Sequence, residues 1–95
     1  MKTKMRATSL QAFTDILENI GERQMQVLKA FRKIQPASNL MISKYLNLPI
    51  NCITGRCSEL RKMHIIMMDR IDICEFTGRK VIYWRIKKWL NEVMN

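Results

Sequence analysis

The spacing of apolar residues changes once along this chain, from a helical period to a strand period, just after Ile65. Before that point apolar residues recur every three or four positions, which predicts amphipathic helices. After it, an alternation of period two covers residues 71–74 and 81–86, which predicts two strands. A chain of 95 residues has room for one domain. We therefore expect a mostly α-helical domain with a small β-hairpin near its end.

The helical part divides into short segments with recognisable ends. Ser9 and Ser38 are candidate N-caps, and Gly21 and Pro36 end the first and second segments. Asn47 stands where a helix often ends in a left-handed residue. The pattern predicts helices over residues 9–20, 22–34, 39–46 and 49–63, and one or two helical turns over 88–95.

The helix over residues 49–63 carries the candidate site. Three of its apolar residues lie within about 40° of one another on a helical wheel and should face the core. They are Ile53, Cys57 and Leu60. The opposite face is small and polar, a composition that lets a helix approach base edges, while Arg56 and Arg61 flank the apolar stripe. An ordinary solvated helix is the alternative, although only Glu59 is acidic. The outward residues are Asn51, Thr54, Gly55, Ser58 and Lys62.

The two predicted strands are joined by residues 76–80, where Gly78 is available for a positive φ. The hairpin has a basic tip, Arg79 and Lys80, and more cations follow at positions 85, 87 and 88. Acidic residues stand at positions 69, 72 and 75. The alternative is therefore that some of these cations form ion pairs with acidic residues of the neighbouring strand. We expect Trp84, with Ile82 and Ile86 on the same face, to pack on the helices and not to stack on bases.

Charge and composition favour one class of partner and argue against others. Seventeen Lys and Arg against eight Asp and Glu give a net charge of +9, which points to a polyanion such as nucleic acid. No apolar run reaches the roughly 20 residues of a membrane span, and no signal-peptide core is visible. Three cysteines and one histidine argue against a disulfide framework and against a zinc site. The sequence motifs of nucleotide-binding proteins and hydrolases are absent. We expect a cytoplasmic protein without enzymatic activity, metal, cofactor, membrane contact or small-molecule substrate.

A set of short stretches occurs in a familiar order. They are Gly21-Glu22-Arg23-Gln24 with Val27-Leu28, Ser38-Asn39 with Ile42 and Tyr45-Leu46, Leu48-Pro49-Ile50-Asn51, Ile53-Thr54-Gly55-Arg56, Glu59-Leu60-Arg61-Lys62, and Cys74 with Thr77-Gly78-Arg79-Lys80 and Trp84. Over residues 20–86 the chain resembles the small winged helix-turn-helix proteins of bacteriophages and prophages. The resemblance implies a three-helix core plus a wing, here with extra N- and C-terminal helices. His64 stands where many such domains have glycine.

The resemblance also implies a function. Winged helices usually bind duplex DNA with the third helix in the major groove and the wing beside it. We expect sequence-specific binding of double-stranded DNA by a phage or prophage transcriptional regulator, in the cytoplasm of a bacterial host. The alternatives are a protein-interaction module, such as an inhibitor of a host system, and a low-specificity DNA-binding accessory in replication or packaging. The expected DNA contacts are Asn51, Thr54, Gly55, Arg56, Ser58, Lys62, Arg79 and Lys80.

Three regions follow from these assignments: a basic tail and N-terminal helix over 1–20, the winged domain over 21–87, and a C-terminal helical segment over 88–95. Residues 1–8 read as a solvated terminus, with a phosphate-binding arm as the alternative. Large exposed apolar surfaces usually mark interfaces, so the terminal apolar residues predict a homodimer. Packing of the two termini on each other within one chain is the alternative. These residues are Leu10, Phe13, Leu17, Ile20, Trp89, Leu90, Val93 and Met94.

Overall fold

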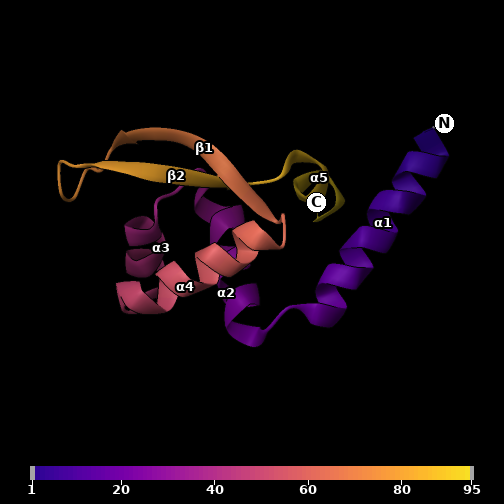
Figure 1. Ribbon diagram of the computed structural model, residues 1–95, viewed down its shortest axis with the longest axis horizontal. Coiled ribbons are helices and arrows are strands. Elements are labelled where there is room, and N and C mark those ends of the chain that lie inside the picture. Colours follow the sequence, from indigo (N-terminus) through magenta and orange to yellow (C-terminus); the bar gives the residue numbers. More distant parts are fainter. Residues whose placement is uncertain (1, 95) are drawn as a thin grey trace.

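The computed structural model describes residues 2–94 of the chain, and their side chains from Ser9 onward. The helices are α1 (Lys2–Asn19), α2 (Glu22–Ile34), α3 (Asn39–Leu46), α4 (Ile50–Lys62) and α5 (Lys88–Met94), and the strands are β1 (Ile66–Ile73) and β2 (Lys80–Ile86). Helices α2, α3 and α4 gather beneath the hairpin, while α1 runs away from them toward the N-terminus (Figure 1). The predicted fold class is confirmed: a three-helix core, a two-stranded wing and an extra helix at each end.

The core is made by the apolar stripes of α2, α3 and α4. Phe31 and Ile42 have no exposed surface, and the three predicted inward residues of α4 are all buried. Burial raises the pKa of the Cys57 thiol to about 12, so this group stays protonated and acts as a small core residue. The helical period before Ile65 therefore identified the buried stripe of α4, whereas on α3 it also placed Tyr45 inward, and that side chain is 50% exposed.

Local side-chain and backbone chemistry sets both ends of α3 and the start of α4. The Ser38 hydroxyl accepts a hydrogen bond from the Met41 N–H at 3.3 Å, which makes Ser38 the predicted N-cap. Asn47 has a φ of 56°, the left-handed conformation expected of it. Pro49 lies just before α4 and not in its first turn, because its ψ of 145° is still extended. The predicted start of this helix is therefore one residue too early.

The hairpin is antiparallel, with Ile66 opposite Ile86 at its base and Ile73 opposite Lys80 near its tip. The register shifts between Met68 and Arg70, so β1 carries a bulge that alternation did not predict. The strand ends at Ile73, and Cys74 begins the turn. The Cys74 N–H donates to the carbonyl of Arg79 at 2.8 Å, which closes the tip. Gly78 has a φ of 73° and His64 a φ of 62°, and both are conformations expected from the sequence.

Packing of the hairpin changes along its length. At the base Ile66 and Ile86 are buried, whereas Ile71 is 59% exposed. Trp84 lies between these extremes, half-buried against the core, and it exchanges two backbone hydrogen bonds of 2.8 and 3.0 Å with Ala37. Ile82 faces the helices as expected, but it lines an open groove with Asn39 and Thr54 and stays 38% exposed, so it does not join the core.

The terminal helices contact each other and also the core. Leu90 of α5 is fully buried, and Gln35 holds this end of the chain in place. The Gln35 side chain donates to Asn91 at 3.0 Å and accepts from the N–H of Ile86 at 2.9 Å. The C-terminal apolar stripe therefore covers the core of its own chain.

Helix α1 differs from its prediction in two ways. It begins at Lys2, not near Ser9, because no glycine or proline interrupts the earlier residues. Its inward residues are Phe13 and Ile16, followed by Ile20 just after its end, whereas Leu10 is 51% and Leu17 45% exposed. The predicted basic tail falls inside α1, in a part of the chain whose side chains are not described.

Candidate nucleic-acid interface

The outward face of α4 follows from the burial of its apolar stripe. Because that stripe is anchored on the core, the opposite residues point to solvent. Asn51, Thr54, Ser58 and Lys62 are all exposed. A Cβ added at Gly55 would meet no atom within 4 Å, so the helix surface is open to close approach there. The structure thus brings five of the predicted contacts onto one surface.

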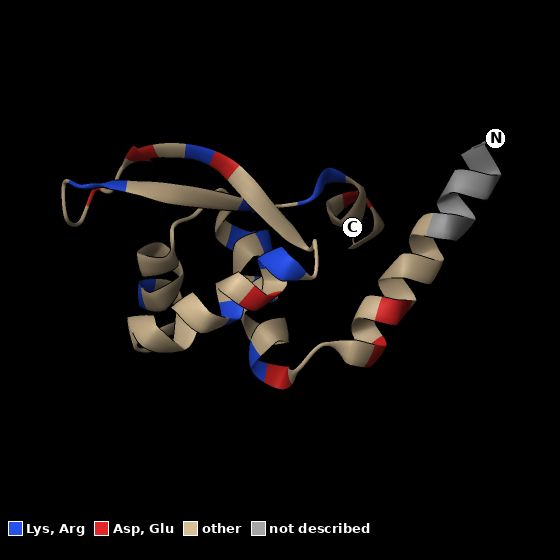
Figure 2. Cartoon of the chain, viewed as in Figure 1, with Lys and Arg blue, Asp and Glu red and all other residues tan. Residues whose placement is uncertain are grey.

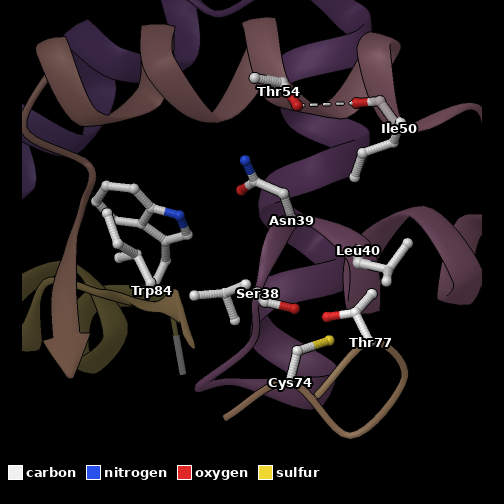
Figure 3. Close-up of a pocket in the computed structure, with 10 residues that line it drawn as sticks. Ser38, Asn39, Leu40, Ile50, Thr54, Cys74, Thr77 and Trp84 are labelled. Atoms are coloured by element: carbon white, nitrogen blue, oxygen red, sulfur yellow. Dashed lines mark hydrogen bonds between the residues drawn. The ribbon is translucent and has the colours of Figure 1, made fainter. Parts of the chain in front are cut away.

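A groove separates α4 from the wing. One part is a cavity of about 330 Å³ between the start of α3, the start of α4 and β2 (Figure 3). A second part, of about 440 Å³, continues along α4 and shares Asn39, Thr54, Ile82 and Trp84 with the first. We call the two parts the helix–wing groove. Its wall on the wing side is apolar, while α4 contributes hydroxyl groups and Arg61.

Arg56 is arranged differently from the other predicted contacts. Its guanidinium pairs with Glu59 at 2.7 Å, and Gln24 of α2 donates to the same carboxylate at 2.7 Å. The hydrogen bond from Gln24, then that from Arg56, lowers the pKa of Glu59. This arrangement directs Arg56 toward α2 and compensates its charge. A DNA contact from Arg56 remains a prediction that requires this ion pair to open.

The cations of the wing fall into two groups. Arg70 pairs with Asp69 at 2.8 Å and with Asp72 at 3.2 Å, and Arg85 contacts Asp69 at 3.4 Å. The alternative of internal charge pairing therefore holds for these arginines. Arg79 and Lys80 lie at the exposed tip, and within residues 9–94 neither makes an ion pair. Figure 2 shows this contrast between the mixed charges of β1 and the basic start of β2.

Three polar residues of this surface were not among the predicted contacts. Asn39 lines both parts of the helix–wing groove, and its side-chain oxygen is buried without a hydrogen-bond partner. Arg61 lines the groove and also a basic depression beside it, to which Lys87 contributes. The helical wheel had placed Arg61 at the flank of the buried stripe. No sequence signal predicts that Lys87 lies near Arg61, because Lys87 follows β2 at the other side of the hairpin.

The described residues hold neither a candidate metal site nor a membrane-spanning helix. Among residues 9–94, no three His, Cys, Asp or Glu side chains come together as metal ligands. No helix within the described part of the chain is long and apolar enough to cross a membrane. Solvent-facing polar and basic groups are therefore the chemistry that this surface offers.

Comparison with known proteins gives the fold. No family model matches the chain, and no curated protein matches its sequence. Matching solved structures include two of ZitR from Lactococcus lactis. A doubly substituted apo form is 17% identical with a TM-score of 0.57, covering 98% of this chain and 67% of ZitR. A singly substituted form is 16% identical with a TM-score of 0.55, covering 98% and 70%. The chain has a winged helix-turn-helix fold.

Proposed function

We propose that this protein binds double-stranded DNA with sequence preference and acts as a transcriptional regulator. The observation that carries the proposal is the outward face of α4, which is small, polar and flanked by cations. Its one acidic residue, Glu59, is already paired with Arg56. Such a face enters a major groove without a clash, and side chains like those of Asn51 and Ser58 can read base edges. Arg79 and Lys80 contact phosphates beside it.

We propose further that the protein acts as a homodimer through α1. Leu10 and Leu17 are 51% and 45% exposed, and they lie on a helix that projects from the rest of the chain (Figure 1). A second copy covering these residues presents two α4 helices to half-sites about one DNA turn apart. A finer assignment, to a phage or prophage regulator, rests on the residue resemblance over 20–86.

Binding of a fluorescent random duplex at low and moderate salt tests the DNA proposal. We expect binding at low salt that weakens as salt rises, because released counterions dominate the affinity. Selection of bound genomic fragments then shows whether one sequence is preferred. Absence of binding at low salt contradicts the proposal.

Light scattering at micromolar concentration tests the dimer. We expect twice the chain mass of 11.3 kDa, and a single chain mass for Leu17→Glu with an unchanged melting temperature. A wild-type protein that stays at 11.3 kDa contradicts the dimer. Loss of folding in Leu17→Glu would instead assign this side chain to the core of one chain.

A protein-interaction module is the second candidate function, favoured by the outer half of the wing. Ile71 and Ile73 are 59% and 51% exposed on one hairpin strand. Apolar groups this exposed commonly mark a protein interface. Failure of the DNA experiment, together with a protein partner whose binding is lost in Ile71→Asp, would favour this candidate.

A further inference from the structure

A basic depression lies at the end of α4 where the chain turns into β1. It has a volume of about 490 Å³, and its wall contains Arg61, Lys62, His64 and Lys87 beside Met67 and Met68. These side chains come from the last turn of α4, the left-handed turn after it, the start of β1 and the segment that joins β2 to α5. A backbone hydrogen bond of 3.0 Å from the Lys87 N–H to the Ile65 carbonyl holds the two segments together.

The depression concentrates positive charge on its wall. Three cations line it and no acidic residue does. The two nearest acids along the chain are already in ion pairs: Glu59 with Arg56, and Asp69 with Arg70 and Arg85. Like charges around one concave surface repel each other, and an anion placed among them relieves that repulsion. The methionines add apolar walls that reduce screening by water.

The depression continues the candidate interface. Arg61 and Met68 line both it and the helix–wing groove, and Lys62 belongs to the outward face of α4. It lies at the base of the wing, whereas Arg79 and Lys80 lie at the tip, at the opposite end of the hairpin (Figures 1 and 2). Strand β1 has eight residues. A strand of that length spans about 25 Å at an ordinary rise per residue.

We propose that the basic depression is a phosphate-binding site that holds the DNA backbone on the other side of α4 from the wing tip. The separation of the two basic clusters exceeds the roughly 12 Å width of a major groove, so they contact different parts of the backbone. With α4 in the groove, one cluster holds the phosphates on each side of it. The inference rests on the proposed DNA binding and adds Arg61 and Lys87 to its contacts.

The experiment compares two variants that lose the same charge. Arg61→Gln with Lys87→Gln removes the two cations that the inference adds, whereas Lys29→Gln with Lys33→Gln removes two from a separate surface of α2. For the first variant, the slope of log K against log salt on a random duplex should fall by about two units, near 0.9 per phosphate contact. The α2 variant should keep the wild-type slope. An unchanged slope in the first variant overturns the inference and leaves DNA binding standing.

His64 supplies a second, direct readout because it is the only histidine of the chain. Its imidazole Hε1 signal in proton NMR should move when the duplex is added to the wild-type protein and stay in place in the Arg61→Gln, Lys87→Gln variant. A signal that moves with poly-glutamate but not with duplex would assign the depression to an acidic protein segment and overturn the inference. Failure of the wild-type protein to bind duplex at low salt would overturn the proposed function itself.

Discussion

The helical core and the outer half of the wing contain the same kinds of apolar side chain, but only the core buries them. Ile42 and Ile53 have no exposed surface, whereas Ile71 and Ile73 are 59% and 51% exposed. Each core helix packs against two others. The outer hairpin lies over α3 (Figure 1), separated from it by an open groove and contacting it where the Lys44 ammonium lies 4.7 Å from the centre of the Phe76 ring. Exposed apolar groups contribute no burial free energy. The outer wing therefore keeps apolar surface that a partner can cover.

The largest expected effect comes from the same substitution made once in each region. Ile42→Ala empties a buried site and should lower the free energy of unfolding by about 2–5 kcal/mol. Ile71→Ala, at an exposed site, should change it by less than about 0.5 kcal/mol. Urea denaturation followed by circular dichroism measures both. Equal losses would mean that the outer wing is packed against something in solution, and the comparison would fail.

Trp84 sits at the boundary between the two regions, so truncating it should give an intermediate loss. Trp84→Ala should cost less than the roughly 3–5 kcal/mol expected for a fully buried tryptophan, because this side chain is only half-buried. The salt slope of duplex binding should not change. Thermal unfolding and duplex titration of one preparation give both values. A variant with wild-type stability and no DNA binding would make Trp84 a ligand contact.

Removing the cations of the tip should affect binding and leave folding intact. Arg79→Ala with Lys80→Ala should lower the salt slope of duplex binding by about two units. The free energy of unfolding should stay within about 0.5 kcal/mol of wild type, because neither side chain is buried. Fluorescence anisotropy at four or five salt concentrations gives the slope. A wild-type slope in this variant would mean that the tip points away from DNA.

The smallest expected effect is a pH dependence of stability that comes from Glu59 on the core helix α4. Hydrogen bonds from Gln24 and Arg56 hold the pKa of Glu59 below its ordinary value of 4.5. Folding thus favours the ionised carboxylate of Glu59. Its contribution to the free energy of unfolding is fully present above pH 4.5 and is lost as the pH falls through the lowered pKa. The melting temperature of Glu59→Gln should lie below wild type at pH 6 and approach it in acid. A difference in melting temperature between the variant and wild type that grows toward low pH would contradict this ion pair.

Much of the fold could be predicted because its signals are local. The cap at Ser38, the left-handed Asn47 and His64, and the turn at Gly78 all depend on residues at most a few positions away. Burial of the α4 stripe is equally local, since helical geometry alone places Ile53, Cys57 and Leu60 on one side. The exposed face of α4, which is most of the candidate site, follows as the complement of that stripe.

The sequence by itself determined which elements form, where the middle helices end, and which face of α4 is polar. Only the tertiary structure decided how closely the wing packs on the helices, where β1 bulges, and which cations remain unpaired. Arg56 is paired through a network that reaches Gln24, 35 residues from Glu59. Lys87 joins Arg61 because β2 returns along β1 to the end of α4. Periodicity and caps report the conformation of a few neighbouring residues, whereas charge pairing and grooves arise between segments that meet only when the chain is folded.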